Sequence, residues 1–340
     1  MPDYIDTMMY VGDTPWHGIG TPLENPPSIE EAILKASLNW EVVKRPTYVI
    51  MDKGTWFDKQ EGKFTGHYVT IRNDSKEILG NVGERYTVLQ NTDAFEPFQP
   101  MLDWGFTLET AGSIKNGKKV WILAKAPEEY TVGDDAIHRY VLLYTSHDGS
   151  SGNCFRDTLV RVVCNNTLNL ALDDKKNSTF EYSLRHTASI KQRVIDLRDR
   201  IEESSGNVQK AVGYMNKMYD RLFNQSEAEV YFEHVIPFLA HRGAKSDTEL
   251  GIYRKDMATP VFEQLMQNYS SGRGNNGKTL WDAYNSVTEY YDHQKNYKDW
   301  MAGTQFGKAS EYKRRALLYA TKIITNDMKH HGQNWITGNS

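Results

Sequence analysis

The stretch that decides the fold is Val141 to Leu172, VLLYTSHDGSSGNCFRDTLVRVVCNNTLNLAL. Two apolar runs, the second from Leu159 to Cys164, flank a tip rich in Gly, Ser, Asp and Asn, which are the residue types that form turns. The runs carry the β-branched, leucine and aromatic side chains that favour strands, so the stretch predicts a β-hairpin. Because side chains alternate along a strand, Arg161 and Asn165 share one face and apolar side chains share the other. The second strand is therefore expected to present a cation and an amide on one side.

Turn signals and hydrophobic periods along the rest of the chain predict strands first and helices later. Short helices are expected to start at Ser28 and Asp93, and strands are expected at Trp40–Ile50, Gly54–Phe57, Lys63–Arg72, Glu77–Leu89, Phe106–Ile114 and Lys118–Lys125. Asn116-Gly117 is the strongest turn signal. From Ile190 onward apolar residues recur at helical spacing, and further helices are expected after a capping box at Ser226–Glu229 and at Pro260–Tyr269, Lys278–Asp292 and Ser310–Lys329.

Strands followed by helices indicate an α+β fold, with a twisted, mostly antiparallel N-terminal sheet and a helical C-terminal half. The connections between the expected strands are too short for parallel crossovers. The expected division is a sheet-rich domain at residues 1–176 and a helical region at residues 177–340.

The composition is that of a soluble globular protein. The chain has 340 residues, 39% hydrophobic and 25% charged, with a formal net charge of -4. No stretch approaches the roughly 20 apolar residues of a membrane span, and the start, MPDYIDTMMY, lacks the plan of a signal peptide. The cytoplasm is therefore the expected compartment. The two cysteines, Cys154 and Cys164, are too few for a disulfide framework or a cysteine-built zinc site, and both are expected to be reduced.

Five separated motifs, in order along nearly the whole chain, resemble the phage/plasmid-like protein family, a group of uncharacterised proteins carried by mobile elements. The motifs are YVGDTPWHGIGTPL (10–23), ILGNVGERYTVLQNTDAFEPF (78–98), the hairpin stretch, SLRHTASIKQRV (183–194) and LWDAYNSVTEYYDH (280–293). The chain also shows a weaker similarity to single-strand annealing proteins of the RecT, Redβ and Rad type. The resemblance implies a bacterial host cell and a role in handling DNA.

Basic residues gather locally on this mildly acidic chain. KNGKKVWILAK, residues 115–125, carries four lysines and no acid. A sheet that collects such residues on one side would form a positive track, although a solvated lysine hairpin with scattered salt bridges explains the same pattern. The residues expected to bind nucleic acid are Lys118, Lys119, Trp121, Arg156, Arg161, Asn165, Arg185, His186, Lys191 and Arg193.

One motif suggests a different chemistry. GRGNNGKT, Gly272 to Thr279, matches the phosphate-loop pattern G-x-x-x-x-G-K-T. That chemistry needs a buried strand before the loop, so that backbone N–H groups point at phosphates. The residues before it, Pro260 to Tyr269, place their apolar side chains at helical spacing instead, which predicts a structural loop between helices.

Other catalytic arrangements lack partners in the sequence. His17 lies in a glycine-rich turn without a placed partner, and His147-Asp148 lies at the hairpin tip. Asp292-His293 and His330-His331 lack the i, i+4 spacing of helical metal ligands. No catalytic residue, metal or cofactor is therefore expected.

The sequence thus predicts a DNA-binding protein of a phage or mobile element, acting on single-stranded DNA in recombination through sequence-independent binding and annealing. Such binding requires Lys and Arg for phosphates and aromatic rings for bases. The partners expected are single-stranded DNA and further copies of the chain. Two alternatives are open: a module that binds a host or phage protein, such as an inhibitor of host defence, and an enzyme that uses a nucleotide at Gly272–Thr279.

Overall fold

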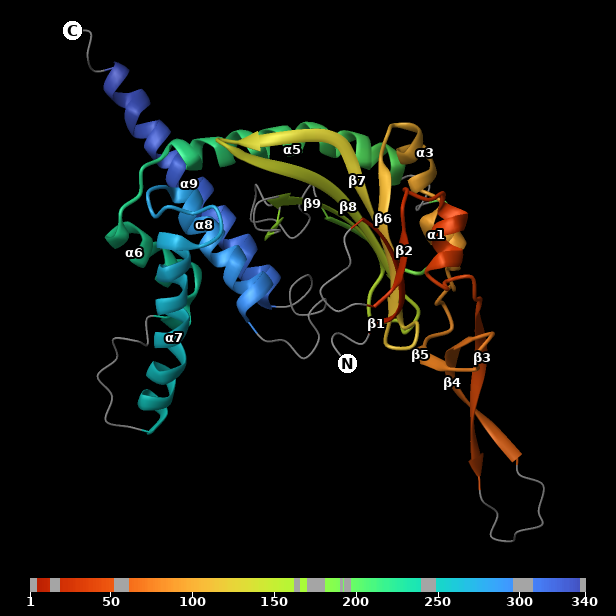
Figure 1. Ribbon diagram of the computed structural model, residues 1–340. Helices are drawn as coiled ribbons and strands as arrows, with labels where there is room; N and C mark the ends of the chain where they lie inside the picture. Colours follow the sequence, from red (N-terminus) through yellow and green to blue (C-terminus); the bar gives the residue numbers. More distant parts are fainter. Residues whose placement is uncertain are drawn as a thin grey trace. The chain divides into compact units, whose positions relative to one another are not determined.

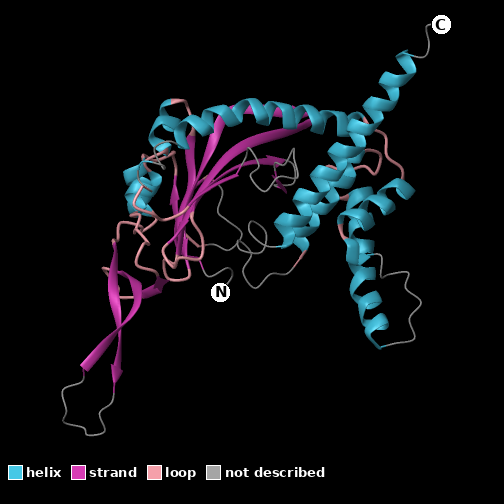
Figure 2. Cartoon of the chain, turned by 180° about the vertical axis from the view of Figure 1, so that it is seen from behind, coloured by secondary structure: helices cyan, strands magenta, loops and turns pink. Residues whose placement is uncertain are grey.

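The protein has an α+β fold (Figures 1 and 2). The computed structural model describes residues 5–12, 19–51, 61–161, 166–169, 181–189, 192, 197–239, 249–295 and 308–336. Within these residues, no helix has the length and apolar character needed to cross a membrane.

The described strands form two sheets. The larger sheet has the strand order β10-β9-β8-β7-β6-β1-β2, with β11 also paired to β9. Its strands are β1 (Ile5–Val11), β2 (Thr21–Leu23), β6 (Thr107–Ile114), β7 (Lys119–Val132), β8 (Asp135–Ser146), β9 (Asn153–Arg161), β10 (Asn166–Asn169) and β11 (Glu181–Leu184). The smaller, antiparallel sheet has the order β3-β4-β5, with β3 at Val42–Met51, β4 at Glu61–Arg72 and β5 at Ile78–Val82.

Helices lie between the early strands and fill the C-terminal half. The early ones are α1 (Ile29–Lys35), α2 (Asn91–Phe95) and α3 (Phe98–Asp103). The later ones are α5 (Leu197–Asp220), α6 (Gln225–Val235), α7 (Glu249–Ser271), α8 (Leu280–Glu289) with the π-helical turn η3 (Tyr290–Gln294), and α9 (Lys308–Ile336).

The chain forms two compact units that interleave along the sequence. Unit 1 comprises residues 1–127, 140–156 and 181–203, and unit 2 comprises residues 128–139, 157–180 and 204–340. Unit 1 has an apolar core that includes Phe95, Phe98 and Ile122, and unit 2 has a separate core around Tyr231 and Trp281. The unit that holds the C-terminal helices therefore also includes residues 128–139 and 157–176. Both segments lie before the domain boundary expected at residue 176.

Local chemistry explains several element boundaries. The hairpin turn between β6 and β7 places Lys115, Asn116 and Gly117 at positive φ, where Asn and Gly are tolerated best. Ser28 caps α1 by accepting a hydrogen bond from the Glu31 backbone N–H at 3.2 Å. The hairpin turn and the α1 cap are confirmed as predicted from the sequence.

Other predicted boundaries were wrong. The capping box of α6 pairs Asn224 with Glu227, not Ser226 with Glu229, because Asn caps as well as Ser and the first turn then starts two residues earlier. Helix α7 begins at Glu249 and accommodates Pro260 in its interior. The strand expected to reach Leu89 ends at Val82 because a turn follows, in which the Tyr86 N–H donates to the Gly83 carbonyl.

The decisive hairpin is present, with β8 and β9 adjacent in the sheet. The returning strand β9 starts at Asn153, earlier than predicted, and its residues are almost all buried on both faces. The expected strand at Gly54–Phe57 and the residues Cys164 and Asn165 lie outside the described residues.

Candidate nucleic-acid interface

Few of the residues predicted to bind nucleic acid are accessible. In unit 1, Lys118 and Lys119 are half-buried at the start of β7, and Arg185 is exposed. The Trp121 side chain is 4% exposed and directs its Nε1 toward Thr110 Oγ1, 3.3 Å away. Because its ring lies inside the unit against Gly112, a base cannot stack on it. The prediction for Trp121 was therefore wrong.

Three further residues that were predicted to bind nucleic acid are buried. Arg156 and His186 in unit 1 and Arg161 in unit 2 are all buried. Strand β9 is divided between the units, so that Arg156 belongs to unit 1 and Arg161 to unit 2. The remaining residues of the prediction, Asn165, Lys191 and Arg193, lie outside the described residues.

Arg161 is a structural cation in unit 2. Its side chain is 1% exposed and forms an ion pair with Asp135, with Nη2 2.6 Å from Oδ2. Asp135 Oδ2 also accepts a hydrogen bond from Trp281 Nε1 at 2.8 Å. Asp157, a carboxylate on the same strand as Arg161, pairs instead with the buried Arg139 at 2.8 Å. The phosphate-binding role of Arg161 is therefore contradicted by its burial and its partners.

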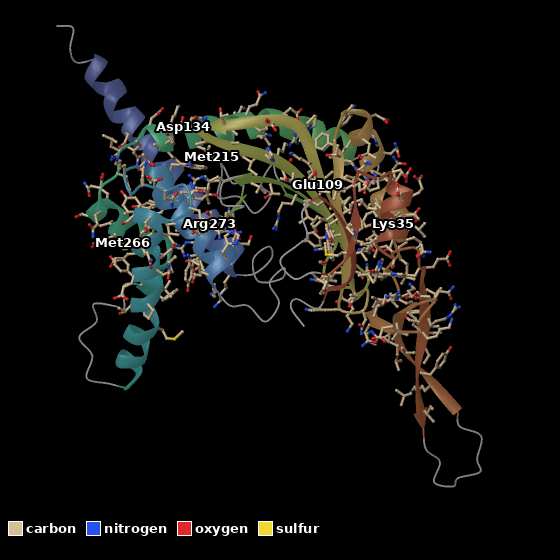
Figure 3. The ribbon with its side chains drawn as sticks, in the orientation of Figure 1. Lys35, Glu109, Asp134, Met215, Met266 and Arg273 are labelled. Carbon is tan, nitrogen blue, oxygen red and sulfur yellow. The ribbon has the colours of Figure 1, made fainter. Side chains whose placement is uncertain are left out.

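The same guanidinium binds the loop that matches the phosphate-loop pattern. Arg161 Nη1 donates to the carbonyl of Arg273 at 3.2 Å and to Asn275 Oδ1 at 2.9 Å, while Nη2 donates to the carbonyl of Gly274 at 2.8 Å. Arg273, labelled in Figure 3, lies in this loop just before α8. The loop thus turns oxygen atoms toward a cation, whereas a phosphate cradle turns N–H groups toward an anion.

Protein groups already satisfy several N–H groups of this loop. Asp282 Oδ2 accepts from the N–H groups of Lys278 and Thr279, at 3.0 and 3.1 Å, in a capping box that starts α8. The element before the loop is the helix α7 rather than a strand. The sequence interpretation of GRGNNGKT as a structural connection between helices is confirmed.

Two exposed aromatic side chains that the sequence analysis did not single out, Tyr48 and Phe64, lie in unit 1 on strands β3 and β4. We call these two strands the ribbon. Figures 1 and 2 show them extending together past β5, and Figure 3 shows side chains along both of its sides. Tyr48 is 57% exposed and Phe64 is 44% exposed. A two-stranded ribbon has no layer of its own to bury such rings against, so they remain accessible.

Three rings form a row on one face of the ribbon. Tyr48 lies directly opposite Phe64 in the strand register, with ring centroids 5.8 Å apart, and Phe64 meets Tyr68 edge-on at 5.6 Å. Gly62 makes room for the row, because a Cβ there would lie 3.2 Å from Tyr48 Cβ. We call this row of Tyr48, Phe64 and Tyr68 the aromatic face.

An irregularity in the strand pairing brings these rings together. The register shifts between Pro46 and Tyr48, so that Thr47 faces extra residues of β4. Thr47 Oγ1 donates to the His67 carbonyl at 2.9 Å, and Thr65 Oγ1 donates to the Thr47 carbonyl at 3.1 Å. Gly66, at φ +81, supplies the left-handed conformation that this bulge requires.

The ribbon is basic although the whole chain is acidic. Its two strands carry Lys44, Arg45, Lys63 and Arg72 against a single carboxylate, that of Glu61. Lys44 Nζ lies 4.6 Å from the Tyr68 ring centroid and donates to the carbonyls of Glu84 and Tyr86. By strand alternation, Arg45 and Lys63 fall on the face opposite the aromatic face, and both are exposed.

Comparison with known proteins places the chain in an uncharacterised family. Residues 78–318 match the family described as Domain of unknown function (DUF932), and the chain belongs to that family. No curated protein and no solved structure matches the chain. Among the described residues, no group of three or more His, Cys, Asp or Glu side chains is arranged to hold a metal ion.

Proposed function

We propose that the protein binds single-stranded DNA through the ribbon, in a sequence-independent manner, as part of strand annealing for a phage or other mobile element in the cytoplasm of a bacterial host. The observation that carries the proposal is the aromatic face, a row of three rings in which Tyr48 and Phe64 are exposed and the half-buried Tyr68 is contacted by Lys44. Rings of this kind stack on any base, and Lys or Arg neutralises phosphates without reading the sequence.

The placement of the charges supports this ligand over a free nucleotide. Arg45 and Lys63 lie on the face of the ribbon opposite the rings, on an extended element rather than around a closed pocket. A strand of nucleic acid is itself extended, so it can follow β3 and β4 while successive bases meet different rings. Annealing further implies several copies of the chain along one strand, and we include homo-oligomerisation in the proposal.

A salt titration with matched lysine variants tests the electrostatic part. Binding of a fluorescein-labelled oligothymidine, followed by anisotropy, should weaken as salt rises, and Lys63→Ala should lower the magnitude of the log–log slope by about 0.7. Lys35, exposed on α1 of the same unit and labelled in Figure 3, provides the control. Lys35→Ala should leave the slope unchanged. Equal slopes for wild type and Lys63→Ala would reject the ribbon as the phosphate contact.

A second candidate is a module that binds a host or phage protein. The observation in its favour is the free length of β3, which is an edge strand with Val49 52% and Ile50 60% exposed. At the start of this edge, the Gln90 amide exchanges two hydrogen bonds with the Val42 backbone. An open apolar edge strand pairs readily with a strand from a partner. Salt-independent retention of a protein partner, with no DNA binding at low salt, would favour this candidate.

A further inference from the structure

The inner end of the ribbon is docked on the turn between β8 and β9, all within unit 1. Thr70 Oγ1 on β4 donates to the His147 carbonyl at 2.6 Å, and the Tyr86 hydroxyl donates to the Ser146 carbonyl at 3.0 Å. Gly80 on β5 lies against the backbone of Asp148 so closely that a Cβ would collide with it. The smaller sheet is thus attached to a short turn that contains a histidine.

The His147 imidazole lies at the centre of this attachment and is completely buried. Its Nε2 is 2.8 Å from Asn91 Oδ1, and Asn91 Nδ2 donates to the Leu38 carbonyl. The Asn91 oxygen is therefore the acceptor and His147 Nε2 carries the proton. Trp40 packs edge-on against the ring at 5.4 Å, and Arg72 from the end of β4 lies over Trp40 at 4.3 Å.

A second buried imidazole holds the segment after β5. His186 stacks on Tyr86 at 4.9 Å, its carbonyl accepts from the Thr87 N–H, and its Nε2 is 3.2 Å from Thr145 Oγ1. The Nδ1 atoms of both histidines are buried and have no hydrogen-bond partner. A proton added at His147 Nδ1 would create a buried cation with no group placed to accept its hydrogen bond.

The charged groups around the histidines do not compensate such a proton. Burial, together with the neighbouring His186 and Arg72 and against the opposing effect of Asp148, lowers the pKa of His147 to about 3. Burial also lowers the pKa of His186, against a hydrogen bond with the Thr87 backbone that raises it. At neutral pH both rings are therefore neutral in the docked state.

We propose that His147 and His186 form an acid-sensitive latch, in which uptake of a proton by either ring releases β4 and β5 from the turn at residues 146–149. Each ring is contacted by a different part of the attachment: Trp40, with Arg72 over its ring, packs against His147, and Tyr86 stacks on His186. Protonation therefore weakens the attachment at two points without requiring unit 1 to unfold. The latch does not depend on what the ribbon binds.

The direction and size of the effect follow from linkage. A released His147 has the ordinary pKa of 6.5, so the released state takes up a proton more readily than the docked state, whose pKa is about 3. The docked state is therefore fully favoured above pH 6.5 and loses stability as the pH falls toward 3. Relative to about pH 7.5, His147 alone should raise the population of the released state about 30-fold at about pH 5.

Hydrogen exchange read by mass spectrometry tests the latch on the whole protein. After correction for the intrinsic pH dependence of exchange, amides of β4 and β5 should open about 30-fold more often at about pH 5 than at about pH 7.5. Amides of β6 in the same unit serve as the internal reference and should change much less. In His147→Gln, which keeps an amide donor for Asn91, most of the pH response should disappear. The control His67→Gln, at an exposed histidine of the ribbon, should keep it.

Two results would overturn the latch. One is exchange of β4 and β5 that is insensitive to pH, or that rises together with β6 by the same factor. The other is a pH response that His147→Gln and His186→Gln both leave intact. If the variants fail to fold, titration of the imidazole signals by NMR in the wild-type protein decides: a His147 that titrates near 6.5 in the docked state contradicts the proposal.

Discussion

Replacing Arg161 with alanine is expected to destabilise unit 2 strongly. The substitution leaves the Asp135 carboxylate, 13% exposed, without its cation, and leaves the carbonyls of Arg273 and Gly274 without their donor. Breaking a buried pair from one side costs about 3–5 kcal/mol, and an unsatisfied buried acceptor costs about 1–3 kcal/mol. Because these terms overlap, we expect a loss of about 4 kcal/mol in the free energy of unfolding.

Urea denaturation followed by circular dichroism measures this loss. The matched control is Arg273→Ala, which removes an exposed arginine from the same network while keeping the backbone carbonyl that Arg161 binds. That change should cost less than about 0.5 kcal/mol. The double variant Arg161→Leu with Asp135→Leu should be more stable than the sum of the two single changes predicts, because it removes both buried charges. A loss below about 1 kcal/mol for Arg161→Ala would refute the reasoning.

Three other expectations concern the loop, the buried ion pairs and the acid response. Lys278→Ala should leave folding intact, and isothermal titration should detect no ATP binding in wild type or variant; ATP hydrolysis abolished by this change would restore the enzyme alternative. Lys313→Met removes the ammonium group that lies 2.6 Å from the buried Asp292 carboxylate, and it should lower the free energy of unfolding in urea by about 3–5 kcal/mol. An unchanged denaturation midpoint would contradict this. The pKa of His147 is about 3 in the folded protein and 6.5 in the unfolded chain. The free energy of unfolding of unit 1 should therefore fall by about 2 kcal/mol between pH 7 and pH 5. A free energy of unfolding that is constant over this range would contradict the neutral, buried state of the ring.

The parts of the fold that the sequence predicts well are those that depend on neighbours in the chain. The Asn116-Gly117 turn requires only residues that tolerate positive φ. The helix before GRGNNGKT is visible in the spacing of its apolar residues, and this spacing separates a structural loop from a phosphate cradle. At the turn and at the helix, the identity and spacing of neighbouring residues were sufficient to predict the structure.

The site depends on contacts that sequence spacing cannot give. Arg161 meets Asp135, 26 residues away, and the carbonyl of Gly274, 113 residues away, so its strand pattern alone permits either a surface or a buried role. The run Tyr48–Ile50 has the composition of a core strand, yet its side chains are exposed because the ribbon continues past β5. Pro46, Gly62 and Gly66 are the available signals, since Pro and Gly inside strands mark edges and bulges.

The central claim is that single-stranded DNA contacts the aromatic face, and photocrosslinking tests it most directly. The protein is irradiated with a bromouracil-substituted oligonucleotide, and crosslinked peptides are identified by mass spectrometry. We expect crosslinks at Tyr48, Phe64 or Tyr68. They should be reduced when Tyr48 and Phe64 are both replaced by alanine, and unchanged by Trp104→Ala, which replaces an exposed aromatic of the same unit outside the ribbon. Crosslinks confined to peptides outside residues 42–72 would contradict it.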